Sequence, residues 1–285
     1  MGRFRLDRLA TVYLFAPLSA RRRMGRARIP ILMYHSIQES ACSTRHAYYD
    51  TSTSPEVFDA HVRFLSENGY SFLGLDDALD ALRSNASAED KKVVVTFDDG
   101  YENFYTHAFP ILQKHGATAT MFLPTAYVGA DPQRFMGKQC LTWGKIRELT
   151  EAGISFGAHS VTHPRLHRLR MEQLEYEIRV SKSEIEDRTG EAVRSFAYPF
   201  AFPEADHAFR STFCGLLTKH GYTSGVSTII GTAHRGSDRY LLERLPVNTW
   251  DDLNLFNAKL EGGYNWLHPL QYGFKAIRRG VSDGA

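Results

Sequence analysis

The chain has 285 residues and a formal net charge of +2, with 43% hydrophobic and 23% charged residues. These values are typical of a globular protein with a sizeable core and exclude a disordered one, and the length suits a single α/β barrel. A nearly balanced charge excludes strong electrostatic steering, and no interleaving of basic and aromatic residues points to nucleic-acid binding.

Residues 1–28 form a basic segment that differs from the rest of the chain. Eight arginines flank the apolar residues 9–16, a stretch too short to span a bilayer. As a secretory signal the segment is poor, because charged residues lie on both sides of the apolar stretch. In addition, cleavage after Ala20 requires a small residue at position 18, where this chain has Leu18. Two interpretations stay open: the segment makes a peripheral contact with an anionic membrane surface, or it forms a helix packed over the barrel end.

The three cysteines, Cys42, Cys140 and Cys214, are far apart and show no CxxC spacing. We expect them to be inert thiols, which fits a reducing compartment. The sequence therefore favours a cytoplasmic or membrane-surface protein and leaves a periplasmic or extracellular location open. It does not indicate the oligomeric state.

From residue 29 onward, predicted strands and helices alternate. Apolar runs bounded by turn residues predict the strands, while Ser54 and Thr142 are typical helix N-caps and Gly69 and Gly190 typical helix stops. The expected strands cover residues 29–34, 71–73, 92–97, 118–123, 154–158, 195–198, 222–226 and 241–247. The expected helices cover residues 54–69, 76–83, 101–115, 142–153, 171–189, 205–220 and 250–260.

Strands that alternate with helices imply a parallel sheet, and about seven such units imply that the sheet closes on itself. We therefore expect a distorted, TIM-barrel-like (β/α) barrel of about seven parallel strands. The barrel domain is expected to cover residues 29–270, between the basic segment 1–28 and a tail, 271–285. In such barrels the reactive groups gather where the strands end.

Two adjacent acids stand at one of these strand ends. Asp98 and Asp99 directly follow an apolar run, where like charges resist joint ionisation unless a cation or proton offsets them. His159 and His163 follow another predicted strand about sixty residues later. One Asp and two His match the ligand count of a catalytic Zn²⁺ that keeps a position open for water.

An adjacent acid pair has a chemical use at such a centre. One carboxylate binds the metal, and its neighbour takes a proton from water whose pKa zinc lowers to about 7. The histidines are four apart, but Ser160 and Pro164 make a zincin helix improbable, so we expect one at the strand end and one on the turn. Alternatives are that one acid caps the following helix and that the histidines are structural.

Three motifs resemble those of the polysaccharide deacetylases, carbohydrate esterase family 4. They are Thr96-Phe97-Asp98-Asp99-Gly100, His159-Ser160-Val161-Thr162-His163 and Phe196-Ala197-Tyr198-Pro199-Phe200, with supporting similarity at residues 119–123 and 141–143. The resemblance covers roughly residues 29–250. It implies a distorted barrel of β/α units and a bound divalent metal, expected to be Zn²⁺.

Carried over by position, the resemblance implies Asp98 as the general base and Asp99, His159 and His163 as the metal ligands. The backbone N–H of Phe200 would help to hold the oxyanion of the tetrahedral intermediate. The substrate-binding candidates are Tyr198, Pro199, Phe200 and Trp143.

Two positions depart from the family pattern. Ala197 stands where many members have an Arg that orients the catalytic acid, and Asn248 stands where a C-terminal Leu-x-His would supply the proton donor. Residues 31–37 resemble the first strand of permuted exopolysaccharide (poly-N-acetylglucosamine) deacetylases, in which His35 would be the general acid. A buried structural role for His35 stays open. From its position on the last predicted strand, Arg244 is expected to reach Asp98.

The predicted function is that of a metal-dependent hydrolase that removes N-acetyl groups from an amino-sugar polymer or glycoconjugate and releases acetate. The expected partner is an N-acetylated glycan. Two alternatives are an amidohydrolase of a lipid- or nucleotide-linked amino sugar or other non-polymeric amide, and a catalytically dead carbohydrate-binding barrel. The sequence does not indicate the glycan, its linkage or the physiological metal.

Overall fold

A computed structural model describes residues 5–22, 28–39, 50–84 and 90–273. Seven parallel strands run in the order β2-β14-β12-β11-β10-β7-β6, and β6 pairs with β2, so the sheet closes into a barrel. A further strand, β5 (Ser71–Phe72), extends the sheet beside β6. The barrel strands are β2 (Ile31–Tyr34), β6 (Lys92–Phe97), β7 (Thr120–Leu123), β10 (Ser155–Ala158), β11 (Ser195–Ala197), β12 (Ser224–Ile230) and β14 (Leu242–Pro246). The expected fold class is confirmed.

The strands read as continuous apolar runs because both of their faces are buried. In β6, Val93, Val95 and Phe97 join the cluster beneath the outer helices, while Val94 belongs to a second cluster. That second cluster contains residues from six barrel strands and four apolar residues of α4 (Leu75–Arg83). Alternate side chains thus point outward and inward, and α4 packs against the inner set.

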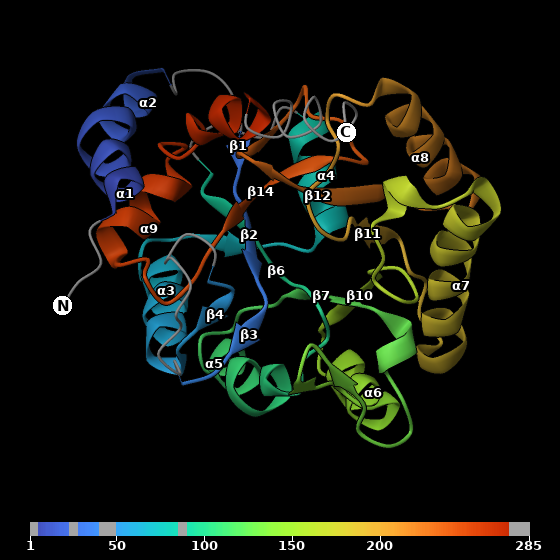
Figure 1. The fold of residues 1–285 in the computed structure, drawn as a ribbon. Helices are drawn as coiled ribbons and strands as arrows, with labels where there is room; N and C mark the ends of the chain where they lie inside the picture. Colours follow the sequence, from blue (N-terminus) through green and yellow to red (C-terminus); the bar gives the residue numbers. More distant parts are fainter. Residues whose placement is uncertain (1–4, 23–27, 40–49, 85–89, 274–285) are drawn as a thin grey trace.

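Helices surround the barrel (Figure 1). They are α3 (Pro55–Glu67), α5 (Phe109–Lys114), α6 (Trp143–Glu151), α7 (Met171–Thr189), α8 (His207–Lys219) and α9 (Leu253–Leu260). The Ser54 and Thr142 hydroxyls accept the N–H groups of Val57 and Lys145, and Gly190 ends α7 at a φ of 74°, as their positions predicted. Short 3₁₀ turns lie at η4 (Thr125–Tyr127) and η5 (Leu166–Arg168).

Two expected elements differ from the structure. The helix predicted at 101–115 is a π turn, η3 (Phe104–Ala108), that leads into α5, since Pro110 cannot donate the regular hydrogen bond. The strand predicted at 222–226 continues to Ile230 as β12, and the connection to β14 contains β13 (Ala233–His234) instead of a helix. β13 pairs with β1 (Arg28–Ile29) in an antiparallel manner. The barrel is therefore distorted on this side.

The described part of the basic segment is a helix beside α9, formed by α1 (Leu6–Ala10), η1 (Thr11–Phe15) and α2 (Ala16–Arg22) (Figure 1). Phe15 stacks on Trp266 with ring centroids 4.7 Å apart, and the Trp266 indole donates to Thr11. The described part of the segment thus packs as a helix against α9 and Trp266, while Leu6, Tyr13 and Leu14 stay exposed. Residues 1–4, 23–27 and 274–285 of the predicted terminal segments lie outside the described residues.

In the ranges that the structure describes, no helix has both the length and the apolar character needed to cross a membrane. Cys140 and Cys214 are free thiols, and burial raises the pKa of each to about 11, as expected for inert groups. Cys42 lies outside the described residues.

Candidate active site

The predicted site residues come from strands that end at one rim of the barrel. Tyr34 at the end of β2 pairs with Phe97 at the end of β6, so His35 and Asp98 emerge side by side. Ala158 at the end of β10 pairs with both Leu123 and Phe196, which brings His159 and the segment after β11 to the same rim. Parallel strand order thus brings together residues that are far apart in the sequence.

Asp99, His159 and His163 form a group able to hold a metal. The Asp99 Oδ1 atom lies 3.6 Å from Nε2 of His159 and 3.5 Å from Nε2 of His163. Bonds of about 2.0–2.1 Å in a tetrahedral Zn²⁺ site place ligand atoms about 3.3 Å apart, so the spacing suits this ion. Among the His, Cys, Asp and Glu side chains in the described part of the chain, these three residues are the set whose ligand atoms lie close enough together to hold one metal ion.

The hydrogen bond made by the second nitrogen of His159 supports this assignment. His159 Nδ1 donates to the carbonyl oxygen of Ala197 at 2.8 Å, which leaves Nε2 as the unprotonated atom facing Asp99. His163 Nδ1 is buried without a hydrogen-bond partner among the described residues. Burial and then the neighbouring His159 lower the pKa of His163 to about 4. His163 is therefore neutral near pH 7 and suited to bind a cation, and both rings turn Nε2 toward Asp99.

The backbone is strained around this group. The non-glycine residues with positive φ in the described chain are Asp99 (75°), Met136 (48°), Ser160 (65°), His163 (55°) and Phe200 (58°). Four of them lie in the three sequence motifs. Such left-handed conformations cost about 1–3 kcal/mol each and persist where the surroundings hold them.

Glu177 on α7 holds the turn that contains His163. Its carboxylate accepts the N–H groups of Val161 and Thr162 at 2.7 and 2.9 Å and the Thr162 hydroxyl at 2.7 Å. Glu177 is 6% exposed. Sequence reasoning missed this residue, although a Glu beside the apolar positions Leu174 and Ile178 of α7 was a detectable signal.

Asp98 lies next to Asp99 in the chain and is held by Arg244. Two hydrogen bonds of 2.7 Å join the Arg244 NH1 and NH2 atoms to the two Asp98 carboxylate oxygens, and Arg244 Nε donates to Ser227 O. Arg244 is 0% and Asp98 2% exposed. Burial opposes the charge of Asp98, but Arg244 and His159 outweigh it and hold the pKa of Asp98 well below its usual range.

His35 lies on the other side of Asp98. Its Nε2 atom is 4.0 Å from Asp98 Oδ2, which is beyond hydrogen-bond distance. Its side chain is 20% exposed. Burial lowers the pKa of His35, and the Asp99 and Asp98 carboxylates offset only part of that shift. His35 therefore borders the site without being tied to the acid.

Aromatic rings surround the metal group on the outer side. The Phe200 ring, 40% exposed, lies 4.6 Å from the His163 ring, and the Arg165 guanidinium lies 5.5 Å above Phe200. Phe135 lies 5.0 Å from His163 on a hairpin of β8 (Arg134–Phe135) and β9 (Lys138–Gln139). Burial and then the Asp99 carboxylate raise the pKa of the Tyr101 hydroxyl well above its ordinary value. Sequence reasoning missed Phe135, Arg165 and Tyr101.

The predicted substrate-binding residues divide into two groups. Phe200 is exposed beside His163, and the described residues offer no acceptor to its backbone N–H. Tyr198 and Pro199 are buried, with Tyr198 packed against Phe202 and Phe213. Trp143 is 4% exposed at the start of α6, beneath the Arg188 guanidinium. These three side chains are thus buried rather than exposed at the surface of the site, and Tyr198 and Trp143 belong to the core cluster between the barrel and its helices.

Residues 85–224 match the family model of the polysaccharide deacetylases. A Bacillus subtilis protein named as a polysaccharide deacetylase, YxkH, is 31% identical over 235 residues, which are 82% of this chain and 77% of the relative. The poly-β-1,6-N-acetyl-D-glucosamine N-deacetylase of Escherichia coli is 32% identical over 129 residues, 42% of this chain and 19% of that enzyme.

Two solved structures also resemble this chain. The Streptococcus pyogenes deacetylase PplD, solved with acetate, superposes with a TM-score of 0.72 at 27% identity and covers 82% of this chain and 99% of that one. The structure of IcaB from Ammonifex degensii superposes with a TM-score of 0.64 at 22% identity, which shows a shared fold.

Proposed function

Since this chain belongs to the polysaccharide deacetylase family, we propose that it is a hydrolase that removes N-acetyl groups from an N-acetylglucosamine polymer and releases acetate. The observation that supports this most strongly is the Asp99, His159 and His163 group beside the ionised Asp98. Amide hydrolysis needs a cation for the carbonyl oxygen and a base for water, and this pair of features offers both.

The proposed metal ligands are Asp99, His159 and His163, and the proposed ion is Zn²⁺. A divalent ion held there would polarise the acetamide carbonyl and lower the pKa of water. The two imidazoles and one carboxylate are a donor set that zinc accepts, with the His159 tautomer already fixed by Ala197.

The remaining residues have complementary roles. Asp98 takes a proton from the attacking water, and Arg244 holds the Asp98 carboxylate ionised and oriented. The Phe200 N–H donates to the oxyanion that forms when water adds to the acetamide carbon. His35 as imidazolium then protonates the nitrogen as the C–N bond breaks, so that acetate and a free amine leave.

The test is acetate release from soluble β-1,6-linked N-acetylglucosamine oligomers after the protein has been loaded with one equivalent of zinc. Asp98→Asn and His35→Ala should each lose about 10²–10⁴-fold in kcat/KM while still binding zinc, because each removes one proton transfer. Asp99→Ala should lose zinc itself. Zinc loss in Asp98→Asn would contradict its assignment as the base.

The same assay separates the alternative substrates. Acetate release from a nucleotide-linked or lipid-linked amino sugar, with none from oligomers, would show that the substrate is a monomeric amino sugar and not a polymer. Zinc binding with oligomer affinity but without acetate release from any of them would identify a binding barrel instead.

A further inference from the structure

The N-terminal helix, formed by α1, η1 and α2, turns an apolar face away from the barrel. Among residues 5–19, every exposed side chain is apolar: Leu6, Leu9, Tyr13, Leu14, Pro17 and Leu18. Leu6 and Tyr13 are each 71% exposed. An ordinary surface helix shows the opposite pattern, with its charged residues toward water.

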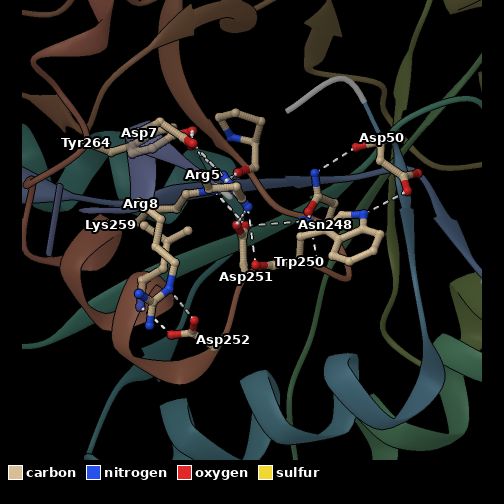
Figure 2. Close-up of polar contacts among 12 residues, drawn as sticks. Arg5, Asp7, Arg8, Asp50, Asn248, Trp250, Asp251, Asp252, Lys259 and Tyr264 are labelled. Carbon is tan, nitrogen blue, oxygen red and sulfur yellow. Dashed lines mark hydrogen bonds and ion pairs between the residues drawn. The ribbon is translucent and has the colours of Figure 1, made fainter. Parts of the chain in front are cut away.

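Arg5, Asp7 and Arg8, at the start of this helix, make ion pairs on its other side. Figure 2 shows Arg5 in contact with Asp251, at 3.0 Å, and with Asp7, which also accepts the Tyr264 hydroxyl. Lys259 binds the other oxygen of Asp251 at 2.6 Å. Arg8 pairs with Asp252 at the first turn of α9. The Arg5 and Asp251 side chains are 5% and 0% exposed, so this network fixes the helix by its polar side.

The outer face is therefore not needed to hold the helix in place. The inner contacts are complete, because Phe15 stacks on Trp266, Val12 packs against the core cluster and Ala16 lies against Gly263. Of the twelve exposed large hydrophobic residues in the described chain, five lie on this one helix. A clustered apolar patch of this kind marks an interaction surface.

The neighbouring charges indicate the partner. Arg21 and Arg22 are the last two residues of α2, and Arg23 and Arg26 come next in the sequence. No Asp or Glu occurs from residue 8 to residue 38. An apolar helix face with adjoining arginines is the combination that binds anionic lipid. A second copy of the chain fits less well, because six side chains are far fewer than the roughly 20–30 residues a side of a stable interface, and pairing would bring two arginine clusters together.

We propose that this helix is a membrane-surface contact, which lies in the headgroup region of an anionic lipid layer with Leu6, Leu9, Tyr13, Leu14 and Leu18 inserted. The ion pairs around Arg5 and Asp251 fix the helix to the barrel, so the barrel is held at the lipid surface together with the helix. The contact is independent of the metal group and of the proposed deacetylation.

Vesicle flotation of the full chain tests the proposal. The vesicles consist of phosphatidylcholine alone or of phosphatidylcholine with phosphatidylglycerol. The variant Tyr13→Ser/Leu14→Ser removes two exposed apolar side chains from the helix. The control Met171→Ser/Tyr176→Ser removes two large apolar side chains from α7, on the opposite side of the barrel in Figure 1, where they are 51% and 49% exposed.

Wild type and control should float with the anionic vesicles, more weakly with phosphatidylcholine alone and more weakly at high salt. The helix variant should bind at least about tenfold more weakly, since two large apolar contacts are lost. Its circular dichroism and its acetate release from a short soluble oligomer should match those of the wild type.

Three results would overturn the proposal. They are a wild type that does not float with anionic vesicles, a helix variant that floats as the wild type does, and a lipid-independent dimer that the helix variant abolishes. The last result would assign the face to a second copy. Absent acetate release in every protein, with flotation as expected, would count against the deacetylase assignment alone.

Discussion

At the scale of single residues, the charge of Asp98 depends on one guanidinium. Arg244 is fully buried, and its bidentate contact with Asp98 is supported by Ser227 O and Thr96 Oγ1. Two buried charges recover their desolvation cost only when the geometry and the hydrogen bonds are nearly complete. Replacing Asp98 or Arg244 alone should therefore lower the free energy of unfolding more than replacing both.

Arg244→Gln should lower the free energy of unfolding by about 3–5 kcal/mol, because it leaves the Asp98 charge buried without its partner. The double variant Asp98→Asn/Arg244→Gln replaces the pair by neutral groups and should recover part of that loss while staying inactive. Urea unfolding of the wild type, both single variants and the double variant gives the coupling energy. A coupling energy near zero would show that the pair does not act as a unit.

Glu177→Gln should weaken zinc binding about 10–100-fold with little change in the fold, because the turn before His163 loses a charged acceptor. Competition with a chromophoric chelator measures the affinity. The control is Glu175→Gln on the same helix, whose carboxylate pairs with Lys219 and His220 at the surface. Equal zinc affinities in the two variants would contradict the proposal that Glu177 positions the turn before His163.

At the scale of elements, β12 and its connection to β14 pack unusually closely. The Gly225 N–H donates to Arg239 O at 2.8 Å, and a Cβ atom at Gly225 would lie 2.4 Å from Tyr240 O. The connection has no helix to separate the two strands, so the backbone itself covers β12.

Gly225→Ala should lower the free energy of unfolding by about 1–3 kcal/mol, because the methyl group meets backbone that cannot move freely. Gly215→Ala is the matched control, since no atom lies within 4 Å of its added Cβ and it sits in α8. That control should raise stability by about 0.5–1 kcal/mol. Urea midpoints compare the two, and a Gly225→Ala midpoint at or above that of wild type would contradict the close packing.

The barrel and the position of its rim were predictable because each barrel strand is an apolar run that ends at a turn. β6 has its predicted bounds, and the acids and histidines follow strand ends as expected. The hairpin of β8 and β9 was not predictable, because two-residue strands carry almost no periodicity. Glu177 and Phe135 reach the site through contacts between distant elements, which local patterns do not encode. The catalytic and ligand roles themselves stay predictions.

At the scale of the whole molecule, His61 joins the first half of the barrel to the last. Its ring stacks on Phe256 with centroids 4.0 Å apart, Nδ1 faces the Tyr34 hydroxyl at 3.1 Å, and Nε2 donates to Asp251 O at 2.7 Å. Burial, partly offset by the Asp251 carbonyl, lowers the pKa of His61 from 6.5 to about 4. As the pH falls, His61 therefore takes up its proton at a lower pH in the folded protein than in the unfolded chain.

Stability should consequently fall as the pH drops from about 6.5 toward 4, where the unfolded chain alone is protonated at His61. At pH 4.5 this one group should cost about 2–3 kcal/mol relative to pH 7.5. Urea unfolding of wild type and His61→Gln at both pH values isolates the contribution, because the variant lacks the titrating group. The wild-type advantage should shrink at the lower pH, and an unchanged difference would contradict the assigned shift.

Closure of the barrel also sets an order of events during synthesis. β2 pairs with β6 on one side and with β14 on the other, and β14 leaves the ribosome roughly two hundred residues after β2. Until then the nascent sheet has two unpaired edges, and Asp98 has no guanidinium beside it. A chain that stops before residue 242 thus contains the three proposed metal ligands and His35 but lacks Arg244, the counter-charge of the proposed base. Translation that ends early should therefore yield no partly active product, and the last barrel strand determines when the enzyme becomes competent.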